Sequence, residues 1–135
     1  MSKLKIIGWI LSGLLAAMLI GISASGKLFY DFEGKEKMFA KLGWEADVMF
    51  YVGILEVTAT ILYLIPRTAV LGGLLLIGYL GGAVATHLRI EDPISSTLTP
   101  VIVGIVAWIA LGLRDRRVFR FVFQSPDTPI RIHED

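Results

Sequence analysis

One apolar run with a single carboxylate near its centre most constrains how this chain can fold. Residues 48–65 read VMFYVGILEVTATILYLI, and Glu56 is the one charged side chain among them. Eighteen residues of α-helix measure about 27 Å, close to the hydrocarbon thickness of a bilayer. A carboxylate at that depth costs a few kcal/mol or more if it faces lipid. The run therefore predicts a membrane span that turns Glu56 toward other helices or toward water.

Three more apolar runs account for a composition that a soluble domain of this size does not have. Of the 135 residues, 55% are hydrophobic, and the mean hydropathy is +0.70, whereas soluble domains are about 45–50% apolar. The predicted spans are residues 6–25, 48–65, 69–88 and 97–113. The turn Pro66-Arg67-Thr68 is so short that the neighbouring spans must run antiparallel. We predict an all-α fold: an antiparallel up-down membrane four-helix bundle forming one integral membrane domain, residues 1–135.

The first run also has features of a cleavable signal peptide. Basic Lys3 and Lys5 precede it, and small residues at positions 23–25 follow its apolar centre. The run is longer than a usual signal-peptide core, which favours an uncut first span.

The polar connection and the tail carry weaker signals. In residues 27–47, Met38, Phe39 and Leu42 fall on one helical face, which predicts a short interfacial helix between the first two spans, with Trp44 at the interface. A solvated loop is the alternative. The tail, residues 114–135, contains two prolines and mixed charge and is predicted to be loosely ordered.

Small residues recur at four-residue spacing in two spans. This spacing lets helix backbones approach closely, although glycine and alanine are common in membrane helices in any case. The predicted packing residues are Gly13, Ala17, Gly21, Gly78 and Gly82.

Polar residues suggest a pocket at one end of the bundle. Thr60 and Tyr63 share the helical face of Glu56. In an up-down bundle Lys27 and residues 86–89 lie together at one membrane surface, about 13 Å from Glu56. The candidate pocket or proton-relay residues are Glu56, His87, Thr60, Tyr63, Lys27, Arg89 and Thr86.

In such a pocket Glu56 could bind a cation or relay a proton, with His87 as a second relay group. The alternatives are a buried Glu56 that hydrogen-bonds a facing helix, and an interfacial His87 without a function. Arg89 could reach lipid phosphates or pair with Glu91 or Asp92.

Composition excludes several function classes. The chain has no cysteine, which rules out disulfides, iron–sulfur clusters and thiolate metal sites formed by this chain. It has two histidines and no HExxH pair, so we expect no metal site, and His87 and His133 fall on opposite sides of the membrane, which disfavours a haem. A net charge of +1 gives no nucleic-acid footprint. No catalytic residue can be assigned.

Lysine and arginine counts predict the orientation. Four spans place both termini on one side, together with eight of the 13 basic residues. These eight are Lys3, Lys5, Arg67, Arg114, Arg116, Arg117, Arg120 and Arg131. Basic residues collect on the cytoplasmic side, so we predict that both termini are cytoplasmic and that Arg114 belongs to a basic collar after the fourth span.

Three segments of the chain form a distinctive set: ISASGKLF at the end of the first span, GILEVTATILYLIPRTAVLGGLLLIGYLGGAVATHLRI through the next two, and PVIVGIVAWIALGLRDRR at the close of the fourth. On these segments, residues 14–118 resemble the DoxX-like family of small four-span bacterial membrane proteins. The resemblance implies a four-helix bundle in the bacterial inner membrane. In some members it also implies a small subunit of a quinone-linked oxidoreductase or an accessory part of a redox or detoxification complex.

Three functions follow as hypotheses. The first is an accessory subunit that binds a membrane redox partner and a quinone or lipid. The second is a small transporter or channel that uses Glu56 as an ion or proton site; because four spans enclose only a thin pore, this hypothesis predicts a homo-oligomer. The third is an enzyme acting on an apolar substrate such as a quinone, with Glu56 or His87 as proton donor. The cofactor is unknown, and a quinone is the candidate.

Overall fold

Four long apolar helices make up most of the protein. The computed structural model describes residues 1–127. The first span, Lys3–Leu28, is a continuous run of α1 (Lys3–Ala16), η1 (Ala17–Ala24) and α2 (Ser25–Leu28). The others are α4 (Ala46–Leu64), α5 (Ala69–Arg89) and α6 (Ile94–Arg114). Each of the four is long and apolar enough to cross a membrane, which confirms the predicted all-α bundle of four membrane helices.

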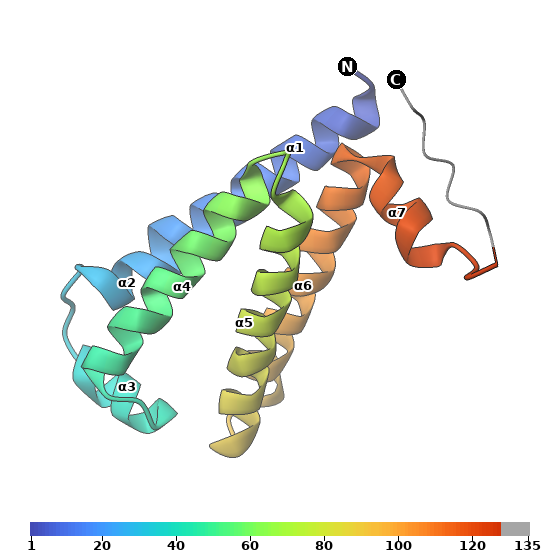
Figure 1. Cartoon of the computed structure of the whole chain (residues 1–135). Helices are drawn as coiled ribbons and strands as arrows, with labels where there is room; N and C mark the ends of the chain where they lie inside the picture. Colours follow the sequence, from blue (N-terminus) through green and yellow to red (C-terminus); the bar gives the residue numbers. More distant parts are fainter. Residues whose placement is uncertain (128–135) are drawn as a thin grey trace.

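The helices are arranged as two legs that meet at one end (Figure 1). The first leg contains α1, η1, α2 and α4, and the second contains α5 and α6. The legs pack together where α1 contacts α6 and where α4 contacts α5, near the N-terminus. We call this the closed end. At the other end, the open end, the two legs diverge, and α3 (Lys35–Leu42) lies beside the first leg.

The turn between α4 and α5 explains the close contact at the closed end. Ile65 is extended, with φ −74° and ψ 121°, because a residue that precedes proline disfavours the helical conformation. The Thr68 hydroxyl then donates to the carbonyl of Leu62 at 2.8 Å, which satisfies one of the free carbonyls at the end of α4. The chain is thereby turned back directly beside α4.

The first span contains an eight-residue π-helical segment, η1. A π-helix has more residues per turn than an α-helix and occurs often at functional sites. It changes the direction in which the residues after it point relative to those of α1. Ser23 belongs to η1 and Lys27 to α2, and α2 packs against α4.

The bounds of two spans differ from those predicted from the sequence. The fourth span begins at Ile94 instead of residue 97, so Pro100 lies inside α6. Since proline has no N–H, it cannot donate to the carbonyl of Ser96. The first span continues to Leu28 instead of ending at residue 25, which places Lys27 within it.

The short helix α3 between the first two spans is confirmed, and its ends have a clear cause. Gly34 and Gly43 flank it with φ of 81° and 82°, a conformation that glycine adopts without a steric penalty. Phe39 is buried against the protein, whereas Met38 is exposed on the surface.

Part of the tail is helical, which corrects the prediction that it is loosely ordered. Helix α7 (Arg116–Phe123) begins after Asp115, whose side chain accepts from the N–H of Arg117. Hydrogen bonds from Arg117 also hold the pKa of Asp115 below its usual range. Residues 128–135, which include the Arg131 and His133 of the charge and haem arguments, lie outside the described residues.

The glycines that allow close packing are not the predicted ones. A Cβ placed on Gly13, Gly21, Gly78 or Gly82 would meet nothing within 4 Å, and Ala17 is exposed. These residues therefore do not bring helices of this chain together. The close contacts lie at glycines outside those stripes: Gly72 adjoins the backbone of Tyr63, and Gly8 adjoins the backbone of Ala110 and Arg114.

Gly72→Ala should separate α4 from α5. Its Cβ would overlap backbone atoms of Leu62 and Tyr63, which cannot rotate away, so we expect a loss of about 1–3 kcal/mol in the free energy of unfolding. Gly78→Ala in the same helix is the matched control: its Cβ enters open space, and alanine's higher helix propensity should leave stability unchanged or raised by up to about 1 kcal/mol. Denaturant unfolding in detergent micelles measures both variants, and equal stabilities would contradict the packing assigned to Gly72.

Candidate functional site

A buried ion pair lies between the first span and α4. Lys27 Nζ is 2.8 Å from Glu56 Oε2. The Glu56 side chain is fully buried, and that of Lys27 is 12% exposed. Gly53, one turn before Glu56, makes this approach possible, since a Cβ there would lie 2.9 Å from Lys27 Cβ. The sequence identified both charged residues as candidates, but it did not predict that they pair with each other.

The ion pair extends into a polar cluster formed by three membrane spans. Lys27 Nζ donates to Ser23 Oγ at 2.6 Å, to Glu56 Oε2 at 2.8 Å and to Tyr79 Oη at 3.1 Å. Tyr79 comes from α5, so the cluster joins the two legs. The second carboxylate oxygen, Glu56 Oε1, is buried and has no hydrogen-bond partner within residues 1–127. A buried charged acceptor without a partner is costly, and such atoms commonly mark functional positions.

This cluster borders a cavity of about 640 Å³ between the legs. Its walls are mostly aliphatic and come from both legs, with Met18, Ile22, Leu55, Leu80 and Val103 among them. Such a volume suits a small organic ligand, and apolar walls with a few convergent polar groups are typical of binding sites for such molecules. The polar lining residues are Ser23, Lys27, Trp44, Glu56, Tyr79, Thr86, His87, Ser96 and Thr99.

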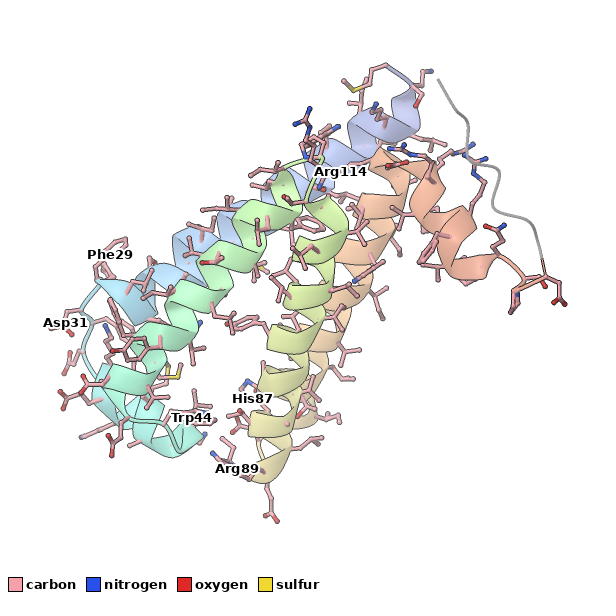
Figure 2. All side chains as sticks on the ribbon, viewed as in Figure 1. Phe29, Asp31, Trp44, His87, Arg89 and Arg114 are labelled. Atoms are coloured by element: carbon pink, nitrogen blue, oxygen red, sulfur yellow. The ribbon has the colours of Figure 1, made fainter. Side chains whose placement is uncertain are left out.

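Polar contacts join the legs across the open end of the cavity (Figure 2). Arg89 Nη2 donates to the carbonyl of Leu42 at 2.7 Å, and its guanidinium lies 5.5 Å from the centre of the Trp44 ring. The Trp44 indole N–H reaches Thr86 Oγ1 at 3.4 Å. These contacts attach the end of α3, and Trp44 just beyond it, to the end of α5.

Asp92 adds a second connection at the same end. It lies 2.7 Å from His87 Nδ1 and 3.2 Å from Lys41 Nζ. The hydrogen bond from His87, and then that from Lys41, hold the pKa of Asp92 below its usual range. His87 pairs with Asp92, and Arg89 contacts the chain around Trp44 instead of the acidic neighbours considered from the sequence.

The predicted candidates divide into two groups. Lys27, Glu56, Thr86 and His87 all line the cavity, and Arg89 contacts its rim. Thr60 and Tyr63 are buried elsewhere. The Thr60 hydroxyl donates to the carbonyl of Glu56 within its own helix, and the Tyr63 hydroxyl donates to the carbonyl of Ala107 at 2.6 Å, toward the closed end.

Tyr79 is a member of the cluster that was not among the candidate pocket residues predicted from the sequence. It is the one polar side chain in the apolar body of α5, before Thr86. A polar group in the body of a span is itself a signal of a functional position.

Arg114 is a second buried cation, at the closed end. The prediction of a basic collar is wrong for this residue, because its side chain is only 6% exposed and turns into the protein. Its guanidinium donates to the carbonyls of Tyr63 at 3.0 Å and Leu64 at 3.1 Å, and lies 3.9 Å from the centre of the Trp9 ring. These contacts join α1, α4 and α6 where the legs meet (Figure 2).

The acidic and histidine side chains are dispersed in the described part of the chain. Among residues 1–127 no three of them lie close enough together to hold a metal ion.

Comparison with known proteins gives a family and nothing finer. A model of the DoxX-like family matches residues 10–110, which is more than half of the chain. No curated protein and no solved structure matches the chain.

Proposed function

The chain belongs to the DoxX-like family, and from that premise we propose that this multi-pass membrane protein binds a small lipid-soluble molecule in the cavity between its legs. The observation that carries the proposal is the polar cluster of Lys27, Glu56 and Tyr79 at the border of an otherwise apolar cavity. A molecule with an apolar body and one polar head group matches both parts of that surface.

The cavity is placed to receive a ligand from the bilayer. Met18, Ile22 and Leu55 line it and are also exposed on the surface of their helices. These exposed aliphatic surfaces would accept the apolar tail of a lipid-soluble ligand that enters between the legs.

The wider role that we propose is that of an accessory subunit in the bacterial inner membrane, with both termini cytoplasmic. The chain has no cysteine to hold an iron–sulfur cluster, so its part in a redox or detoxification system would be to bind a quinone-like or lipid ligand for a partner subunit. Co-purification of the native protein with such a subunit tests this role, and consistent recovery of the protein alone, with its own turnover, would contradict it.

The alternative function, transport of an ion or proton through Glu56, fits the cluster less well. The Lys27 ammonium already occupies the position beside Glu56 Oε2 that a transported cation would take. Flux into proteoliposomes separates the two functions. Ligand binding alone predicts no flux above that of empty liposomes, and a flux that Glu56→Gln abolishes would favour transport.

Two neighbouring glycines of α5 offer a matched test of ligand binding. Gly82 lines the cavity between the legs and Gly81 does not, and a Cβ at either position meets nothing within 4 Å. We expect Gly82→Phe to fill part of the cavity and to weaken binding by about tenfold or more, whereas Gly81→Phe should leave binding unchanged.

The measurement uses purified protein in nanodiscs and three probes with the same alkyl tail: a phenol, its methyl ether and a benzoquinone. Saturable binding of at least one probe, lost in Gly82→Phe and kept in Gly81→Phe, supports the proposal. Uptake that never saturates, or that is the same in both variants and in empty nanodiscs, would overturn it.

A further inference from the structure

The ammonium protons of the cluster are already in use. An ammonium group has three protons, and Lys27 Nζ has three close acceptors in Ser23, Glu56 and Tyr79. A ligand that offers only acceptors would have to break one of these bonds to reach the ammonium, and it would leave Glu56 Oε1 without a partner.

An acceptor remains free. Among the cavity-lining side chains that the structure describes, Glu56 Oε1 is the one buried polar atom without a hydrogen-bond partner. A carboxylate oxygen accepts and cannot donate. A ligand group that pairs with Glu56 Oε1 must therefore be a hydrogen-bond donor.

The charge of the cluster further limits the class of ligand that the cavity can bind. Lys27 and Glu56 together are neutral, so the cluster attracts neither sign strongly. An anionic head group would approach Glu56 Oε1 with like charge and find no unused ammonium proton. A cationic head group would lie close to Lys27, in an environment where charges are poorly screened.

From this we propose, resting on the proposed function, that the cavity selects neutral ligands whose head group donates a hydrogen bond to Glu56 Oε1. The class comprises long-chain alcohols, phenols and hydroquinones. The corresponding ethers, quinones, carboxylates and phosphates are disfavoured. For a quinone-type ligand, the site holds the reduced form in preference to the oxidised form.

Binding includes a local rearrangement of the cavity wall. Glu56 Oε1 is buried, so the ligand hydroxyl displaces the atoms that cover it as it arrives. The apolar tail then lies between the legs, along Leu80 and Val103. Burial of that tail supplies affinity, and the hydrogen bond to the carboxylate supplies selectivity.

The test compares the three probes on the wild-type protein in nanodiscs. At a pH where the phenol is neutral, we expect it to bind about tenfold or more tightly than its methyl ether, since a hydrogen bond to a charged acceptor contributes at least that factor. The benzoquinone should bind no better than the ether. Equal affinities for phenol and ether, or a preference for the quinone, would overturn the inference and leave the proposed function standing. No saturable binding of any probe would remove the proposed function itself.

Variants of Glu56 test whether its carboxylate is the acceptor of the ligand's hydrogen bond. In Glu56→Gln the ratio of phenol to ether affinity should fall toward one, because the amide is a weaker acceptor of nearly the same shape. Glu45→Gln, at the exposed N-cap of α4, is the matched control and should keep the wild-type ratio. A full wild-type ratio in Glu56→Gln would assign the selectivity to another group and refute the role of Oε1. If Glu56→Gln does not fold, the double variant Lys27→Met with Glu56→Gln gives the same comparison.

Discussion

Lys27→Met lowers the free energy of unfolding by about 3–5 kcal/mol, the cost of leaving a buried charge without its partner. Methionine keeps a long unbranched side chain, so the loss comes mainly from the missing ammonium. Glu56, fully buried, would then have neither oxygen paired with a cation. Denaturant unfolding in detergent micelles measures the effect.

Adding Glu56→Gln to Lys27→Met should restore much of the lost stability, because the stranded charge is removed with it. The two single variants and the double variant form a thermodynamic cycle whose coupling energy isolates the ion pair. The control is Lys37→Met, at an exposed position of α3, which should change stability by no more than about 0.5 kcal/mol. A Lys27→Met protein as stable as the Lys37→Met protein would show that the pair contributes nothing to the fold.

Arg114→Leu should destabilise the closed end by about 2–4 kcal/mol, because hydrogen bonds to charged groups contribute about 1.5–3 kcal/mol each and the acceptors stay behind. The carbonyls of Tyr63 and Leu64 lie at the end of α4, beyond the reach of intrahelical donors. Arg114→Lys keeps the charge but loses the planar fork that donates to both carbonyls, so it should recover only part of the stability.

Arg120→Leu is the matched control for Arg114. It removes an arginine from the exposed face of α7 and should shift unfolding by about 0.5 kcal/mol or less. Thermal unfolding followed by circular dichroism compares the three variants in one detergent. If Arg114→Leu and Arg120→Leu unfold at the same temperature, the Arg114 guanidinium does not stabilise the helix contacts at the closed end.

The four spans could be predicted because the thickness of a bilayer fixes how long an apolar helix must be. Residues 69–88 were expected and Ala69–Arg89 is observed. The short helix α3 was predicted for a related reason, since a helical face of apolar residues needs a surface to cover. Both features depend on the local sequence alone.

The pairing of Lys27 with Glu56 could not be read from the sequence in the same way. The first span was expected to end at residue 25, which left Lys27 at the membrane surface. In the structure a π-helical segment and a longer span bring Lys27 alongside α4. No residue pattern in AMLIGISA identifies a π-helix, and the approach also requires Gly53 on the opposite helix. The pair is a tertiary property of two segments.

The prediction that glycines at four-residue spacing bring helices of this chain together was wrong for a similar reason. Four-residue spacing shows that Gly78 and Gly82 share a face of α5, but it does not show whether another helix lies against that face. Here that face borders the cavity. Gly72, which does pack closely, is placed by the tight turn that precedes it, because the turn brings the backbone of Tyr63 alongside.

The arrangement of the legs has a mechanical consequence for what the protein can accommodate. At Gly72 the two backbones are in contact, and the guanidinium of Arg114 fastens three helices nearby. At the far end the attachment consists of a few surface hydrogen bonds and ion pairs, such as those of Arg89 and Asp92. A small rotation of one leg about the closed end therefore displaces its residues by a distance that increases toward the open end. Extra bulk in a guest molecule should be tolerated best beside Trp44, at the open end, and worst on the side of the cavity that faces the closed end.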